Sequence, residues 1–216
     1  NLVAELNVNG FADLKVGEIL IEDTFITTTT SDGNLELRTS GAGVVDIQAG
    51  ASIAEGLTVE GAVTINDAGA DVDLRIESNA EENMIFLDAS ADALGIKTAT
   101  PKASLQVEEM GIDCETTQGS GTTQLQVAEY AVADFRTAKI LIQITDSTAG
   151  EYQAQEFLVT HNGTDVKFTE YAIVFTGTGA LATFTAQINS GTIELIAAPQ
   201  TANTLDYKVA KTMITV

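Results

Sequence analysis

The feature that most constrains the fold is a two-residue alternation of apolar and polar residues, repeated in short runs along most of the chain. Successive side chains of a β-strand point to opposite faces of the sheet, so this spacing predicts strands with one buried face. In the C-terminal part, Ile140, Ile142 and Ile144 share one face, and Phe157 and Val159 share another. We expect seven strands there, over residues 124–132, 136–145, 151–161, 165–176, 180–188, 191–197 and 204–215. This spacing predicts an antiparallel β-sandwich.

Aromatic residues, glycines and charges divide the chain into two parts. Residues 1–129 hold only three aromatic residues but 13 of the 18 glycines, with 23 acidic against five basic residues. Short runs such as Leu35-x-Leu37 and Leu74-x-Ile76 alternate with turns rich in glycine, asparagine and aspartate, which is typical of short strands. A Leu-x-Val-x-Gly pattern, present twice and then once without its glycine at Leu105, indicates repeated modules. We therefore expect an elongated β shaft.

The apolar residues of this shaft are small, chiefly valine, isoleucine, leucine and alanine. Such strands give one chain a thin apolar face, which offsets little of the entropy lost in ordering an extended shaft. Further copies that place these faces against one another would supply the missing contacts and close the sheet edges. The composition therefore predicts an oligomer and leaves the number of copies open.

Three segments resemble virion proteins of phages. The run Gly95-Ile-Lys-Thr-x-x-Pro101-x-x-x-Leu105-x-Val107 is similar to a Gly-Ile-Gly-Thr-x-x-Pro element of trimeric tail-fibre proteins, with Lys97 in place of the second glycine. Residues 26–47, with their Thr-Thr-Thr-Thr-Ser-Asp-Gly-Asn-Leu sequence, are similar to a module of fibre-like proteins of phages that infect marine cyanobacteria. The C-terminal part resembles a domain of the same phages, marked by Phe135-Arg-Thr-Ala-Lys-Ile, Thr169-Glu-Tyr-Ala, Gly179-Ala-Leu-Ala-Thr-Phe and Ile188-Asn-Ser-Gly. The resemblance implies a homotrimer in a tail fibre or other appendage of the particle.

Three regions follow from these patterns. Residues 1–93 form a repetitive β shaft, residues 94–119 a turn joint with the last shaft strand and a linker, and residues 120–216 a β-sandwich head or docking domain. The polar, glycine-bearing segment 112–123 is expected to be the linker itself. The expected fold class is all-β, with an elongated trimeric shaft followed by an antiparallel β-sandwich.

The joint contains two structural turn residues. Gly95 is expected to end an alternating run, and Pro101 blocks a helix because proline lacks an N–H. Lys97 tests the resemblance, since a turn that requires positive φ is costly for lysine, whereas an extended backbone would show an adapted joint.

The C-terminal part contains further turn signals. Asn162 and Gly163 predict a two-residue hairpin turn, and Asn189-Ser-Gly191 predicts another hairpin. A change of parity in the strand 165–176 predicts a bulge near Thr169 or Glu170.

Charge and motifs exclude several classes of function. The formal net charge of −21 argues against a nucleic acid or an anionic membrane as partner, and no apolar run approaches the roughly 18 residues of a membrane helix. The single cysteine, Cys114, cannot form an intrachain disulfide. A P-loop, a zinc-binding spacing and a Ser-His-Asp arrangement are missing from the sequence. We expect no cofactor, no bound metal and no enzymatic activity.

Isolated reactive residues have simpler structural interpretations. His161 is the only histidine and has no partner for a metal site. Asp71 and Asp73 could hold calcium or form a glycosidase-like pair, but two carboxylates are few for calcium and this part of the chain has no tyrosine or tryptophan. Cys114 lies between two acids, which argues against a nucleophile. Asn162-Gly-Thr164 matches a glycosylation triplet, and the turn is the simpler interpretation.

The four tyrosines are the candidate surface-recognition residues. If they face outward, they could stack on sugars of a host envelope; the alternative is burial in the core or between subunits. They are Tyr130, Tyr152, Tyr171 and Tyr207.

The leading functional hypothesis is a non-enzymatic virion structural protein, a trimeric tail fibre or fibre-like appendage for host attachment or spacing. Its expected partners are further copies of itself, other tail or capsid proteins, and a glycan or protein receptor on the host surface. Two alternatives stay open: a docking or decoration protein at a collar, baseplate or capsid, and a glycan-degrading tail spike.

Overall fold

The computed structural model describes residues 47, 51, 53, 57–65 and 69–216. The chain separates into two compact units, Asn1–Glu60 and Gly61–Val216. Nearly all of the motif at 26–47 and most of the expected shaft lie outside the described residues. The second unit is therefore the part in which sequence and structure can be compared.

Every regular element in the described part of the chain is a β-strand, which confirms the all-β class for these residues. The described strands are β1 (Leu74–Ile76), β2 (Ile85–Asp88), β3 (Ala93–Ile96), β4 (Leu105–Val107), β5 (Met110–Ser120), β6 (Leu125–Ala131), β7 (Phe135–Asp146), β8 (Glu151–His161), β9 (Val166–Phe175), β10 (Ala182–Asn189), β11 (Thr192–Pro199) and β12 (Thr204–Thr215).

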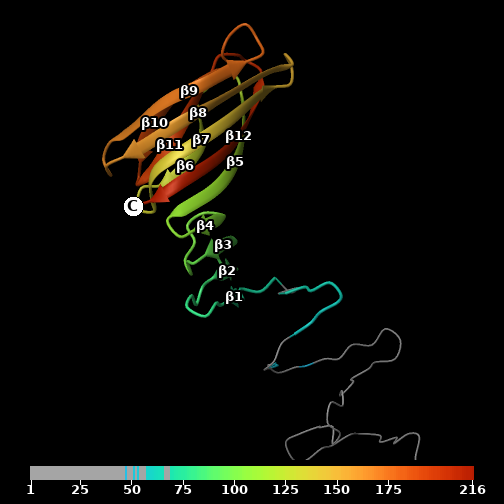
Figure 1. Ribbon diagram of the computed structural model, residues 1–216. Helices are drawn as coiled ribbons and strands as arrows, with labels where there is room; N and C mark the ends of the chain where they lie inside the picture. Colours follow the sequence, from blue (N-terminus) through green and yellow to red (C-terminus); the bar gives the residue numbers. More distant parts are fainter. Residues whose placement is uncertain (1–46, 48–50, 52, 54–56, 66–68) are drawn as a thin grey trace, which may run out of the picture. The chain divides into compact units, whose positions relative to one another are not determined.

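The strands form two sheets (Figure 1). The larger sheet has the order β1-β2-β3-β4-β5-β12-β7-β8-β9, and the smaller sheet has the order β10-β11-β6. Neighbouring strands are antiparallel, except that β3 and β4 are parallel. The last strand, β12, lies between β5 and β7, so the end of the chain closes the middle of the larger sheet.

The core lies between the three-stranded sheet and the long strands of the larger sheet. Ile140, Ile142 and Ile144 of β7 are buried, as the alternation predicts. Phe157 of β8 contacts Phe184 of β10 with ring centroids 5.0 Å apart in an edge-to-face arrangement. Burial of these side chains is the main favourable contribution to folding, at about 1.5–3 kcal/mol for each large apolar residue. The expected β-sandwich is confirmed.

All seven expected C-terminal strands are present as β6 to β12, and their ends lie within two residues of the expected bounds. The expected linker at 112–123 is wrong: residues Met110–Ser120 form β5, which pairs with β12 along nearly its whole length. The hydrogen bonds between adjacent strands join backbone N–H and C=O groups. A segment rich in threonine and glycine can therefore form a strand wherever a neighbour such as β12 has unpaired backbone groups along its edge.

Two local expectations also need correction. Four residues rather than two join β8 to β9, because the Asn162 side chain accepts hydrogen bonds from the backbone N–H groups of Thr164 and Asp165 and stabilises a wider turn.

The irregularity in β9 lies at Ala172, where φ is +53°, and not at Thr169 or Glu170. Glu170 keeps its inward position because its carboxylate accepts a hydrogen bond from the Gln155 side chain. The hairpin at Asn189–Gly191 is confirmed.

The joint is a compact turn between two parallel strands. Gly95 lies inside β3 rather than at its end. The position needs a glycine because a Cβ there would collide with the carbonyl oxygen of Thr98, in the turn that folds back over it. Lys97 has φ +57°, in the left-handed region, so the turn does require positive φ. Pro101 is buried within the turn that leads to β4.

Candidate functional site

The larger sheet has an outer face, on the side away from the three-stranded sheet, and aliphatic side chains line it in two rows. The first row consists of residues that lie opposite one another across five consecutive strands, from β1 to β5: Leu74, Leu87, Leu94, Leu105 and Ile112. The second row, two residues along each strand, consists of Ile76 and Ile85, then Ile96, Val107, Met110 and Ile214 of β12. We call these eleven side chains the aliphatic face.

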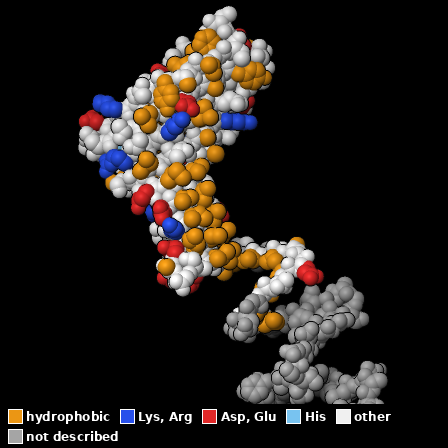
Figure 2. All heavy atoms as spheres, viewed as in Figure 1, with side chains coloured by type: hydrophobic (Ala, Val, Ile, Leu, Met, Phe, Trp, Pro, Cys, Tyr) orange, Lys and Arg blue, Asp and Glu red, His pale blue; other side chains and the backbone are white. Residues whose placement is uncertain are grey.

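The two sides of the short strands β1 to β4 differ. On the inner side, the turn before β4 packs over the sheet, and Ala93 and Gln106 are buried. The Gln106 side chain accepts a hydrogen bond from the backbone N–H of Lys102 and donates one to the carbonyl oxygen of Glu108. On the outer side no described element covers the sheet. Ile76, Leu87, Met110 and Ile214 are 47%, 43%, 38% and 56% exposed, and Figure 2 shows hydrophobic side chains at the surface over this part of the molecule.

The aliphatic face has enough apolar surface to matter energetically. Complete burial of one such side chain is worth about 1.5–3 kcal/mol, and these residues are already partly buried, so about 1 kcal/mol each remains available. The whole face then offers on the order of 10 kcal/mol, which is comparable with the estimated cost of association, about 4–15 kcal/mol. A partner that covers this face would therefore offset much of the cost of association.

A second region of the same outer face carries two of the candidate tyrosines. Tyr152 of β8 is 49% exposed and Tyr171 of β9 is 38% exposed, and Leu141, Leu158 and Val174 lie near them on neighbouring strands. A shallow hollow of about 380 Å³ beside Tyr152 and Val174 opens to solvent.

The other two tyrosines lie in the core. Tyr130 and Tyr207 are 6% and 0% exposed, and burial raises the pKa of Tyr207 to about 12. Neither hydroxyl has a hydrogen-bond partner among the described residues. Of the four candidates, Tyr152 and Tyr171 are therefore the two that can contact a partner directly.

The outer face also differs in charge from the chain as a whole. The outward side chains of β5, β12, β7, β8 and β9 include the lysines Lys139, Lys167 and Lys208 and the acids Glu156 and Asp206. This gives a local charge of +1 in a chain of net charge −21. Lys139 and Glu156 form an ion pair at 3.1 Å, and their hydrogen bond raises the pKa of Lys139.

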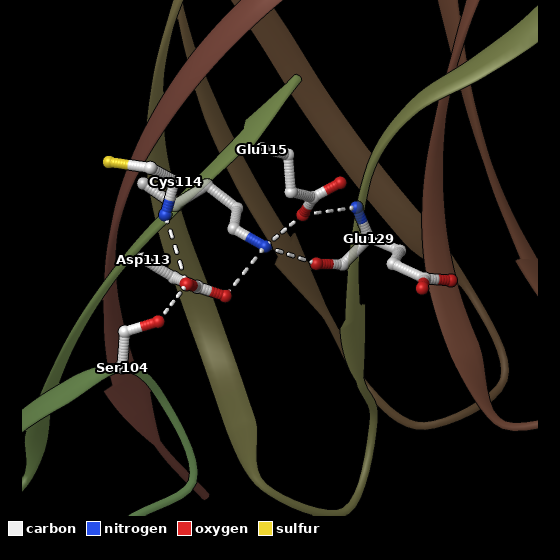
Figure 3. A network of polar contacts seen from close by, with 6 residues as sticks. Ser104, Asp113, Cys114, Glu115 and Glu129 are labelled. Atoms are coloured by element: carbon white, nitrogen blue, oxygen red, sulfur yellow. Dashed lines mark hydrogen bonds and ion pairs between the residues drawn. The ribbon is translucent and has the colours of Figure 1, made fainter. Parts of the chain in front are cut away.

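A buried ion-pair network joins three strands at the side of the sandwich (Figure 3). The Lys211 ammonium of β12 contacts the carboxylates of Asp113 and Glu115 on β5 and donates a hydrogen bond of 2.6 Å to the carbonyl oxygen of Glu129 on β6. Asp113 also accepts a hydrogen bond of 2.7 Å from Ser104, beside β4. The side chain of Lys211 is 2% exposed. This network ties both sheets and the joint together, which is a structural role.

His161 is held by hydrogen bonds at both ring nitrogens. Its Nδ1 accepts a hydrogen bond from the backbone N–H of Gly163, so Nε2 carries the proton and donates to the carbonyl oxygen of Phe135 at 2.7 Å. Gly163 has φ +101°, and the turn residues Asn162 and Gly163 thus position the histidine. The ring fastens the start of β7 to the end of β8, in line with the structural interpretation.

The remaining residues singled out in the sequence are placed as follows. Asp73 accepts a hydrogen bond from the backbone N–H of Ala89 and fastens the turn between β2 and β3, while Asp71 is exposed. Cys114 is exposed on the outer face of β5. Among the described residues, no cluster of three or more histidine, cysteine, aspartate or glutamate side chains could hold a metal ion. In the same part of the chain, no helix is long and apolar enough to cross a membrane.

Sequence reasoning missed the aliphatic face as a connected surface. The signal is present, because each of the segments 74–76, 85–87, 94–96, 105–107 and 110–112 is an aliphatic pair separated by one residue. What the sequence does not contain is the register that places these pairs side by side.

No family model and no curated protein matches the chain. Among solved structures, the tailspike protein of Acinetobacter phage vB_ApiP_P1 matches 50% of the chain with 21% identity and a TM-score of 0.35. The tailspike of Acinetobacter baumannii phage AM24 matches 50% with 10% identity and a TM-score of 0.31. Tailspike gp49 of Acinetobacter baumannii bacteriophage Fri1, described as a capsular polysaccharide depolymerase, matches 50% with 15% identity and a TM-score of 0.32.

These matches span 22%, 26% and 20% of the respective tailspikes. At TM-scores of 0.31 to 0.35 the function has to be argued from the residues of the chain itself.

Proposed function

We propose that the chain is a non-enzymatic structural protein of a phage virion, part of a homotrimeric tail fibre or fibre-like appendage that serves host attachment or spacing. The observation that carries this proposal is the backbone at Lys97. Its φ of +57° lies in the left-handed region, which glycine adopts readily and lysine rarely. This is the position at which the tail-fibre motif has its second glycine.

The match at Lys97 supports the motif in a way that sequence letters alone do not. A segment that shared only its prolines and leucines with the fibre element would have no need of a left-handed residue at this point. Here close approach of the Thr98 backbone requires a glycine at position 95, and the turn requires a positive φ at position 97, which a glycine would adopt without strain. Both glycine positions of the motif thus have a physical reason in this chain.

In this proposal the function is mechanical and adhesive. Three copies held together would present three sandwich domains at once, so that weak contacts to a surface add up to a strong attachment. Tyr152 and Tyr171 are the residues we assign to such contacts, because exposed aromatic rings stack on sugars and pack against protein surfaces. No catalytic step is part of the proposal.

Docking to another virion protein is the second candidate function. The charge of the outer face favours it, since three lysines against two acids make this surface a better match for an acidic protein than the rest of a strongly acidic chain. Docking would use the same exposed residues but would show no saturable binding to host cells.

The test begins with mass and location. Sedimentation of the full chain should give a mass of about 68 kDa, three times 22.6 kDa, and antibodies to the chain should label the tails of the parent particle in electron micrographs. A stable monomer would contradict the trimer, and labelling confined to the capsid would contradict the tail location.

Binding to host cells then separates the candidate functions. Saturable adsorption that Tyr152→Ala with Tyr171→Ala abolishes, and that Thr183→Ala with Thr185→Ala on β10 leaves intact, would support attachment. Binding to tail or capsid proteins without adsorption would favour docking, and loss of host polysaccharide during incubation would favour the glycan-degrading alternative.

A further inference from the structure

We propose that the aliphatic face is the surface through which copies of this chain contact one another, with the aliphatic faces of the three copies turned toward a common axis so that each contacts the other two. This inference rests on the homo-oligomer of the proposed function and adds the residues that form the contact.

The first argument is that the short strands need a second layer. Strands β1 to β4 have three or four residues each, and small sheets of this kind are stable only when their hydrophobic face is packed against something. The inner side has such packing, whereas no described element lies over Leu87 or Ile76 on the outer side. Another copy, another virion protein or another part of the chain can supply the missing layer, and the arguments that follow favour another copy.

The second argument is charge. None of the eleven side chains of the aliphatic face is ionisable, although the chain carries a net charge of −21. Two copies that met through most other surfaces would bring like charges together, which costs free energy at short range. Contact through the aliphatic face keeps the acidic side chains of both copies in solvent, so it favours a second copy as the occupant.

The third argument is shape and size. The face spans six strands at a spacing of about 4.8 Å, with two rows on β1 to β5 and one side chain on β12, so its flat area is about 300 Å². An exposed apolar patch of this size is in the range of the largest patch on a typical soluble monomer, about 300–600 Å², and such patches are often functional. It is smaller than the roughly 800 Å² that each partner contributes to a standard interface, so the aliphatic face should act together with other contacts between the copies.

The regular spacing of the rows also suits self-contact. Leu74, Leu87 and Leu94 lie on adjacent strands at the strand spacing, and the residues that continue the row are of similar size. The neighbouring copies present rows with the same spacing, so the side chains of one face can fit between those of the faces that it meets at the common axis.

A cross-linking experiment on the full chain tests the contact directly. Leu87→Cys is introduced together with Cys114→Ser, and the protein is treated with a short bismaleimide at low concentration. We expect covalent dimers on denaturing gels, in an amount that does not change on tenfold dilution. The matched control is Leu158→Cys with Cys114→Ser, a leucine of similar exposure, 47% against 43%, on the same outer face but outside the aliphatic face; it should remain monomeric on the gel.

A pair of charge variants measures the contribution to assembly. Leu87→Glu with Met110→Glu should raise the dissociation constant of the oligomer at least tenfold, and Leu141→Glu with Leu158→Glu should leave it unchanged. Leu87→Thr with Met110→Thr, which keeps β propensity, provides the same test if the glutamates disturb folding, and circular dichroism checks that each variant is folded.

Three results would overturn the proposal. In the first, Leu87→Cys does not cross-link while the trimer persists; this leaves the proposed function intact and removes the aliphatic face from it. In the second, the control pair weakens the oligomer as much as the pair at Leu87 and Met110. In the third, the chain is a monomer and the thiol at position 87 is protected from alkylation. This result would show that the N-terminal segment of the same chain covers the aliphatic face. It would contradict the proposed trimer as well.

Discussion

Replacement of Lys211 by methionine tests whether the buried ion-pair network stabilises the sandwich. The variant keeps most of the length of the side chain and removes its charge. It leaves Asp113 and Glu115 without their cation and the carbonyl oxygen of Glu129 without its donor. Loss of one partner of a fully buried pair costs about 3–5 kcal/mol. The two carboxylates are 28% and 24% exposed and can be partly hydrated, so we expect a loss of about 3 kcal/mol.

Urea unfolding at a fixed protein concentration provides the assay. With a slope of about 2 kcal/mol per molar urea, the transition midpoint of Lys211→Met should fall by about 1.5 M. The matched control is Lys139→Met, which removes a lysine whose ion pair with Glu156 is exposed to solvent. Such surface pairs contribute about 0–1 kcal/mol, so the midpoint of the control should fall by less than about 0.5 M.

Neutralising the acids should recover part of the loss. In a protein that carries Lys211→Met, the changes Asp113→Asn and Glu115→Gln remove the uncompensated carboxylates, and we expect recovery of at least about 1 kcal/mol. A decrease of less than about 1 kcal/mol for Lys211→Met alone would refute the reasoning. It would show that solvent reaches the network far more than the 2% exposure of Lys211 indicates.

Three further predictions concern single positions. Lys97→Gly should stabilise the protein by about 0.5 kcal/mol, because relief of the left-handed conformation outweighs the gain in chain entropy of the unfolded state and the loss of the exposed ion pair with Glu108. Lys97→Val should destabilise the protein by more than 1 kcal/mol, on the order of the left-handed penalty for a branched residue. Thermal melts of the two variants check these opposite signs. Hydrogen bonds from the Ala149 backbone, the Asn203 side chain and the Thr148 backbone hold the pKa of Asp146 below its ordinary value of 3.8. The stabilisation from Asp146 is therefore complete at pH values above 3.8 and is lost as the pH falls through the lower pKa of the folded state. Asp146→Asn should be less stable than wild type at pH 7, and the difference in unfolding free energy should shrink as the pH is lowered. Urea titrations at several pH values measure this difference. Tyr207→Phe removes a buried hydroxyl without a described partner, so its unfolding free energy should stay within about 0.5 kcal/mol of wild type or rise; a loss above 1 kcal/mol would show that the hydroxyl is hydrogen-bonded.

Some features of the fold could be predicted because they depend only on neighbours in the sequence. The strands from β6 to β12 were found from alternation, since one buried face per strand imposes a period of two whatever the topology is. The structural roles of Gly163 and of the Asn189–Gly191 hairpin follow from local backbone conformation in the same way. The size of the turn at Asn162 is also set locally, because the Asn162 side chain accepts hydrogen bonds from the backbone of Thr164 and Asp165; this contact was missed in the sequence.

Other features needed the partner strand before they could be recognised. Strand β5 is polar and glycine-bearing, and its pairing with β12 along its length, together with β4 at its start, makes it a strand. Lys211 looks like a surface residue in an alternating run, yet its strand position turns it inward, where Asp113 lies directly opposite. The burial of Tyr130 and Tyr207 and the exposure of Tyr152 and Tyr171 likewise depend on which side of each strand faces the smaller sheet.

The sequence by itself determined the all-β class of the described residues and where most C-terminal strands run. Its small and thinly spread apolar residues in the N-terminal part predict that a shaft there would need further copies, which stays a prediction. Each of these properties is a sum over local preferences or over composition. Only the tertiary structure decided that Leu74, Leu87, Leu94, Leu105 and Ile112 form one continuous row. A shift of one residue in any strand would turn its leucine to the opposite side, and register is set by contacts between strands that the linear sequence does not encode one by one.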